Sequence, residues 1–123
     1  MQIEYNLPDL LVVFDEFDDT NEERGFYGFK YTRTDDIVIS ISFDKYERSL
    51  YISTKNADAI TISSFRLQQC KHIRVLDVTK RQIEIISEGL GEFNVRVFLD
   101  LDGLSIISTE YESKTSSSWL SLS

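Results

Sequence analysis

The strongest constraint on the fold is an alternation of apolar and polar residues that recurs along most of the chain. The clearest runs are residues 37–44, which read IVISISFD, and residues 93–99, which read FNVRVFL. Successive side chains of a strand point to opposite faces of a sheet, so such a run buries one face and turns the other toward solvent. Clean alternation is typical of antiparallel sheets. The sequence therefore predicts a mainly β protein.

Turn-forming residues separate these runs. Asp102-Gly103 is the strongest signal, because a two-residue hairpin turn needs positive φ at both central positions. We expect strands near residues 10–14, 26–33, 37–44, 49–54, 59–63, 67–77, 82–87, 92–99 and 103–109. Short strands of this number and spacing predict one domain, residues 1–123, built as an antiparallel meander. The meander forms a sandwich or a partly open barrel, with at most one or two short helices.

Three segments leave alternatives open. Residues 8–17 place Pro8 in what would be the first turn of a helix, but the pair Val12-Val13 slightly favours a strand. Residues 64–72 fit a strand, or a helix capped by Ser64. The last segment, residues 113–123, is rich in serine and suggests a loose tail, although Trp119 suggests that its end docks on the body.

The charge is unevenly distributed. The chain carries 21 acidic and 13 basic side chains, a net charge of −8, and residues 1–25 contain eight of the acidic ones against a single arginine. The rest of the chain is close to neutral, and residues 66–81 are locally basic. A net negative charge opposes non-specific binding to nucleic acid or to an anionic membrane. We therefore expect neither as a partner.

The acidic segment is the main candidate site, and it has two interpretations. As a solvated connection it would only keep the chain soluble. As a contact surface it would attract a basic protein, and an aromatic ring among the carboxylates would anchor the contact. The predicted partner-binding residues are Asp15, Glu16, Phe17, Asp18, Asp19, Glu22 and Glu23.

The sequence contains few residues that could form a catalytic or a metal-binding site. Cys70 and His72 are the one thiol–imidazole pair, but a reactive cysteine usually begins a helix that lowers its pKa. A closed zinc site needs four ligands of the Cys or His type, and the chain has two. Asp100 to Gly103 resembles the start of a calcium loop, but Tyr111 stands where that loop needs glutamate. We expect no enzymatic activity and no cofactor.

Residues 24–31, RGFYGFKY, imitate an RNA-recognition octamer, but an extra tyrosine breaks its register. What remains is a strand with Tyr27, Phe29 and Tyr31 on one face. These rings pack in a sheet or, in an alternative function, form a platform for a small ligand such as a carbohydrate.

A single cysteine and the lack of a charged, apolar leader suggest a cytoplasmic protein. In size, in acidity and in the stretch from Asp15 to Glu23, the chain resembles the small bacterial immunity proteins that neutralise polymorphic toxins. That resemblance implies a non-enzymatic inhibitor that occludes a toxin's active site with its carboxylates. It implies no particular fold.

Overall fold

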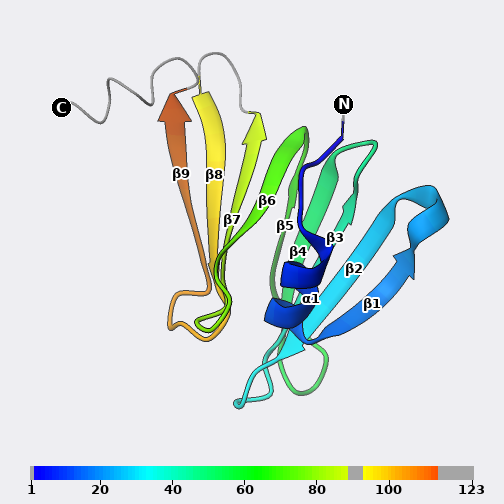
Figure 1. Cartoon of the computed structure of the whole chain (residues 1–123). Helices are drawn as coiled ribbons and strands as arrows, with labels where there is room; N and C mark the ends of the chain where they lie inside the picture. Colours follow the sequence, from blue (N-terminus) through cyan, green and yellow to red (C-terminus); the bar gives the residue numbers. More distant parts are fainter. Residues whose placement is uncertain (1, 89–92, 114–123) are drawn as a thin grey trace.

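Two antiparallel sheets and a short helix make up the part of the chain that the computed structural model describes, residues 2–88 and 93–113 (Figure 1). The elements are α1 (Leu7–Phe14), β1 (Glu16–Asn21), the 3-10 turn η1 (Glu22–Arg24), β2 (Phe26–Thr32), β3 (Val38–Asp44), β4 (Ser49–Lys55), β5 (Thr61–Leu67), β6 (Cys70–Asp77), β7 (Gln82–Glu88), β8 (Phe93–Asp100) and β9 (Ile107–Ser113). One sheet has the order β1-β2-β3-β4-β5 and the other β6-β7-β8-β9. The predicted antiparallel meander is therefore confirmed, as a sandwich-like pair of sheets and not as a closed barrel.

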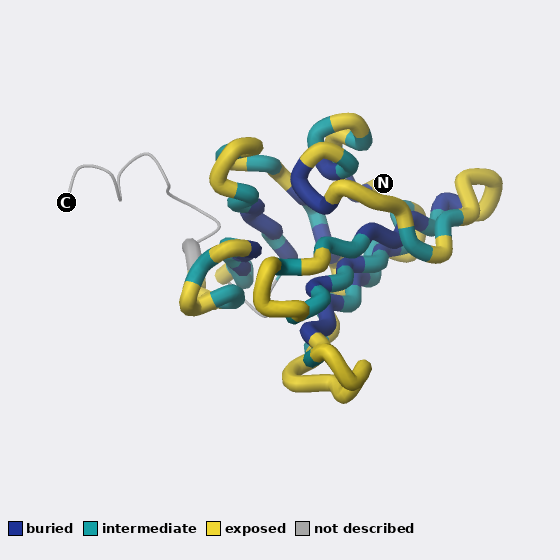
Figure 2. The backbone as a smooth tube through the Cα atoms, turned by 90° about the horizontal axis from the view of Figure 1, so that it is seen from below, coloured by how far each residue is buried: buried dark blue, intermediate teal, exposed yellow. Residues whose placement is uncertain are grey.

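The alternating pattern decides which side of each sheet faces the core. On β3, Ile39, Ile41 and Phe43 are buried, whereas the residues between them are only partly covered. On β7, Ile83 and Ile85 face inward from the opposite sheet. Buried positions alternate with partly exposed ones along the strands, and the connecting turns are exposed (Figure 2).

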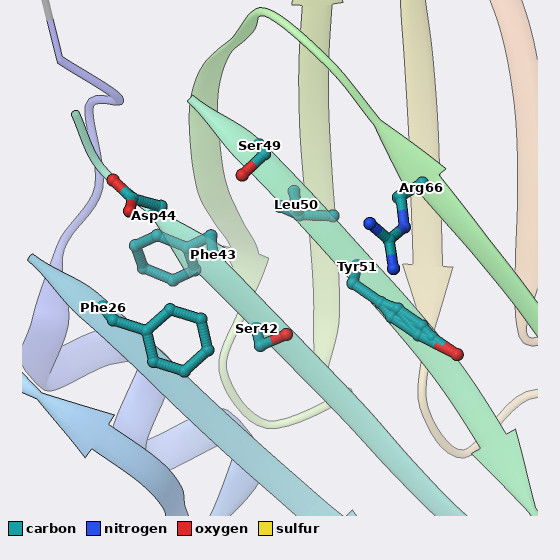
Figure 3. Close-up of a pocket in the computed structure, with 8 residues that line it drawn as sticks. All are labelled: Phe26, Ser42, Phe43, Asp44, Ser49, Leu50, Tyr51 and Arg66. Atoms are coloured by element: carbon teal, nitrogen blue, oxygen red, sulfur yellow. The ribbon is translucent and has the colours of Figure 1, made fainter. Parts of the chain in front are cut away.

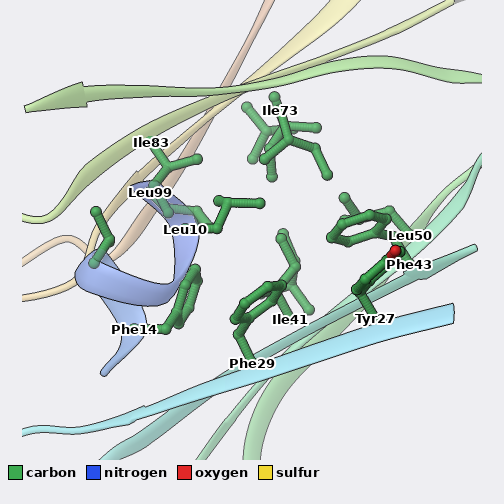
Figure 4. Close-up of a cluster of buried hydrophobic side chains, with 14 of the residues drawn as sticks. Leu10, Phe14, Tyr27, Phe29, Ile41, Phe43, Leu50, Ile73, Ile83 and Leu99 are labelled. Atoms are coloured by element: carbon green, nitrogen blue, oxygen red, sulfur yellow. The ribbon is translucent and has the colours of Figure 1, made fainter. Parts of the chain in front are cut away.

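The segment 10–14 is a helix, and the slight preference for a strand was wrong. Asn6 caps α1 by accepting a hydrogen bond from the backbone N–H of Asp9, and Pro8 occupies the first turn, where its missing N–H costs nothing. The apolar face of α1, Leu10, Val13 and Phe14, is fully buried between the two sheets (Figure 4). This tertiary burial outweighs the weak β-propensity of two valines.

Arg81, in the turn between β6 and β7, ties this helix to both sheets. Its guanidinium donates to the carbonyls of Val12 and Val13 at the end of α1, where the helix dipole favours a cation. It forms ion pairs with Asp15 and Asp102 and lies 4.3 Å from the centre of the Tyr31 ring. Arg81, one of the basic residues of segment 66–81, therefore forms its ion pairs within the molecule.

Further differences from the prediction lie at two turns. The strand predicted near 103–109 exists as β9, but it begins only at Ile107. Asp102-Gly103 belongs to a wider connection and lacks the positive φ of the predicted tight hairpin turn. The helical alternative for 64–72 is also wrong, because that stretch holds the end of β5 and the start of β6. The chain changes sheets at Gln68 and Gln69, where Gln69 has φ 55°. The expected docking of Trp119 falls outside the described residues.

Candidate functional site: an acidic edge and a serine groove

The acidic segment forms the edge of the five-stranded sheet, not the loop that the sequence suggested. β1 pairs with β2 from Glu16 to Asp18, and the register shifts before Asn21. The Asn21 side chain then caps η1 by accepting from the N–H of Arg24, and Gly25 ends the turn with φ 74°. Aspartate and asparagine are poor strand formers, so β1 is held by the neighbouring β2 and α1 and not by its own propensity.

The predicted acidic residues fall into two groups. Asp15 pairs with Arg81 at 3.2 Å and Glu16 with Lys30 at 3.7 Å, so both are engaged within the molecule. No ion pair of the described residues involves the remaining four carboxylates. We call these four the acidic edge: Asp18, Asp19, Glu22 and Glu23.

Phe17 joins this edge to the core. Its ring stacks on the buried Phe29, with 5.3 Å between ring centres, yet 43% of the residue remains exposed. An exposed aromatic side chain that is fixed on one side loses little conformational freedom when a partner covers the other side. Phe17 therefore has the properties of an interface anchor, and it lies next to unpaired carboxylates.

Tyr27, Phe29 and Tyr31 do not form an exposed ligand platform, because two of the three rings are buried. Tyr27 and Phe29 lie in the core, and the Tyr27 ring stacks on Phe43 at 5.6 Å. Tyr31 donates a hydrogen bond of 2.7 Å to Asp102, which raises the pKa of the phenol. The alternation correctly put the three rings on one face, but that face is the inner one.

The side chains of Cys70 and His72 interact with different groups. Burial raises the pKa of the Cys70 thiol to about 12, so the thiolate needed for nucleophilic attack is absent at neutral pH. The Nδ1 atom of His72 lies 3.1 Å from the Glu4 carboxylate, which comes from the N-terminal segment paired with β6. The Cys70 thiol donates to the backbone carbonyl of His72 at 3.8 Å and not to its ring, whereas the His72 imidazole faces Glu4.

Among the residues described, no group of three or more His, Cys, Asp or Glu side chains is placed to hold a metal ion. Asp102, part of the calcium-like sequence, is engaged by Tyr31 and Arg81. Within residues 2–88 and 93–113, no helix has both the length and the apolar character needed to cross a membrane.

A second surface, which the sequence prediction missed, lies on the outer face of the five-stranded sheet. The register aligns two outward rows across the strands. One row is Asp18, Gly28, Ser42, Tyr51 and Arg66; the other is Glu16, Lys30, Ser40, Ser53 and Ser64. Several hollows open on this face. Two of them, of about 310 and 260 Å³, share Phe26, Ser42 and Tyr51 in their lining, and Figure 3 shows the smaller of these two. We call the joined hollows the serine groove.

Small residues make the groove possible. Gly28 lies under the carbonyl of Asp18, where an added Cβ would come within 2.6 Å of the oxygen. Ser40, Ser42 and Ser53 occupy positions where an outer sheet face normally carries long polar side chains. Ser40 and Ser42, which alternate with Ile39, Ile41 and Phe43, are the sequence signal that could have revealed this face.

Ser53 is the unusual member of the groove. Four polar residues are buried in the part of the chain described, and three have side-chain partners: Thr54 bonds to Ser63, Ser87 to the carbonyl of Gln68, and Glu84 to two arginines. Ser53, 8% exposed, lines the larger hollow, and its hydroxyl makes no hydrogen bond with any described residue. Buried polar groups without a partner are rare and costly.

No protein-family model, no curated protein and no solved structure matches this chain. What the two surfaces do must therefore be inferred from their own geometry and chemistry.

Proposed function

We propose that this protein is a non-enzymatic binding module whose acidic edge recognises a basic protein. The observation that carries the proposal is the division among the acidic residues. Asp15 and Glu16 are neutralised inside the fold, whereas the four carboxylates of the acidic edge have no basic partner among the described residues. Like charges held together at one edge repel one another, and a basic partner relieves that repulsion.

The physical consequences concern both the rate and the strength of binding. A concentrated negative field speeds the encounter with a positive surface and orients it. Carboxylates at the rim of an interface add little affinity by themselves, so strength requires a desolvated anchor. Phe17, half exposed beside these carboxylates, supplies that anchor.

In its more specific form, the proposal is that the partner is a toxin and that the protein acts in the cytoplasm as its immunity protein. The acidic edge and Phe17 would then cover the basic residues of the toxin's active site, and inhibition would be stoichiometric. The supporting features are the small size, the net charge of −8 and the concentration of that charge at one edge.

The test compares two variants with the same change in charge. One carries Asp18→Asn, Asp19→Asn, Glu22→Gln and Glu23→Gln; the control carries Asp36→Asn, Glu47→Gln, Asp58→Asn and Asp77→Asn. The probes are an octalysine peptide and the partner recovered by co-purification. We expect the acidic-edge variant to weaken binding of both by about tenfold or more at low salt, equivalent to about 1.4 kcal/mol. The control should stay within about twofold of the unmodified protein.

Two outcomes would contradict the proposal. Equal weakening by both variants would show that only net charge matters. Undiminished binding of the recovered partner by the acidic-edge variant would show that the contact lies elsewhere. Amide shifts in an NMR titration with octalysine locate the contact independently, and we expect them at residues 16–24.

A further inference from the structure

The serine groove differs from the acidic edge in shape and in charge. Its larger hollow is lined by Asp18 and Asp19 on the β1 side and by Lys55 on the β4 side. The neighbouring hollow is lined by Asp44 and Arg66. A basic peptide would meet Lys55 and Arg66, and an anion would meet the aspartates, so charge complementarity favours an uncharged ligand.

The groove also supplies both apolar and polar contacts. Phe26 and Tyr51 come from strands β2 and β4, on either side of Ser42 of β3 (Figure 3). Arg66 lies 5.3 Å from the centre of the Tyr51 ring and braces it from β5. Between and beside the rings, the floor carries serine hydroxyls, which both donate and accept hydrogen bonds. Apolar planes combined with a few convergent polar groups are typical of a small-molecule site.

Ser53 points to a ligand independently of this lining. Only 8% of Ser53 is exposed and its hydroxyl has no partner among the described residues, yet the residue lines the larger hollow. A hydroxyl in this position gains a full hydrogen bond when a ligand supplies the partner. The ligand must therefore carry donors or acceptors that reach the floor of the groove.

We propose that the serine groove binds a neutral saccharide. A sugar ring presents an apolar C–H face to an aromatic plane and hydroxyl groups at its edge, which matches Phe26 and Tyr51 above a serine floor. The proposed site lies on the outer face of the five-stranded sheet, whereas the rings that the sequence indicated, Tyr27, Phe29 and Tyr31, lie on its inner face. It goes beyond recognition of a basic protein and stands on separate observations.

The experiment is an NMR titration of the ¹⁵N-labelled full chain with three neutral trisaccharides: maltotriose, cellotriose and triacetylchitotriose. We expect at least one to shift the amides of Gly28, Ser40, Ser42, Tyr51 and Ser53. Ser53→Val and Tyr51→Ala should each weaken that binding by about tenfold. The matched controls Ser108→Val and Tyr111→Ala, on the other sheet, should leave it unchanged.

The outcomes separate this proposal from the preceding one. The variant Glu22→Gln/Glu23→Gln alters the acidic edge but no residue that lines the groove, so it should lose affinity for octalysine and keep its affinity for the saccharide. The saccharide proposal is overturned if none of the three sugars shifts the groove amides at about 20 mM, the weak end of specific binding. It is also overturned if octalysine or a neutral Gly-Ser octapeptide shifts those amides more strongly.

Discussion

The outer faces of the two sheets differ in how their polar side chains are paired. On the four-stranded sheet, Arg74, Glu84, Arg96 and Glu110 form a chain of ion pairs across all four strands. Glu84 is covered so fully that only 1% of it is exposed. On the five-stranded sheet the corresponding face is floored by small residues, and Ser53 keeps an unpartnered hydroxyl among the residues described. One face is closed by its own side chains, and the other is left open.

The largest effect is expected on the closed face. Glu84→Gln removes a buried carboxylate that accepts from Arg74 at 2.5 Å and from Arg96 at 2.6 Å, and it leaves two arginines side by side. We expect a loss of about 3 kcal/mol in the free energy of unfolding, measured by chemical denaturation. Glu110→Gln breaks a solvent-exposed pair with Arg96 and should cost under about 1 kcal/mol. A loss no greater for Glu84→Gln than for Glu110→Gln would contradict this interpretation of the closed face.

The free energy of unfolding should fall at alkaline pH, because a buried thiol lies in the core between the two sheets. Burial holds the Cys70 thiol neutral and raises its pKa from 9.0 to about 12. Between these values the unfolded chain releases a proton that the folded chain keeps, so stability is complete below pH 9 and falls as the pH rises. At about 1.4 kcal/mol per unit, about 2–3 kcal/mol is lost by pH 11.

Cys70→Ala isolates this contribution. Cys70 begins β6, just after the chain changes sheets, so its titration should destabilise both sheets together in one transition. In the variant, the decline should start only near pH 10, where tyrosines ionise; Tyr31, with its raised pKa, contributes in the same direction. Denaturation midpoints at pH 7, 9, 10 and 11 make the comparison. The same slope in both proteins between pH 9 and 10 would show that the thiol is not the cause.

A smaller effect is expected where β1 lies against β2 at Gly28. Gly28→Ala places a methyl group 2.6 Å from the backbone carbonyl of Asp18, and backbone cannot rotate away as a side chain can. We expect a loss of about 1–2 kcal/mol, with amide shifts along β1. Gly103→Ala is the matched control, because the nearest atoms belong to the flexible Asp100 side chain. Equal effects at the two positions would show that β1 is not pressed against Gly28.

The sequence predicted the β architecture because alternation is local and reports directly on burial. Ile39, Ile41 and Phe43 lie inward as expected. The sequence prediction was wrong where tertiary contacts determine the secondary structure. Segment 7–14 is a helix because both sheets bury its apolar face. Segment 16–21 is a strand because β2 and α1 hold it in place. The pairing of Asp15 with Arg81, 66 positions away, could not be read from the acidic run. The serines of 38–44 mark an outer face in the sequence, but the groove itself could not be read from it, because only the register places Ser40 beside Ser53 of β4.

The smallest effect, and the one most specific to the open face, is expected at Ser53. Ser53→Val replaces a buried hydroxyl that has no described partner with a strand-favouring residue of similar shape, so stability should stay within about 0.5 kcal/mol or rise. Thr54→Val, one position along β4 and facing inward, breaks the 2.7 Å hydrogen bond to Ser63 and should cost about 1 kcal/mol. A side chain kept for stability loses stability when it is changed, whereas one kept for a ligand does not. If both variants cost the same, the Ser53 hydroxyl is satisfied within the fold, and the open face loses the observation that distinguishes it from the closed one.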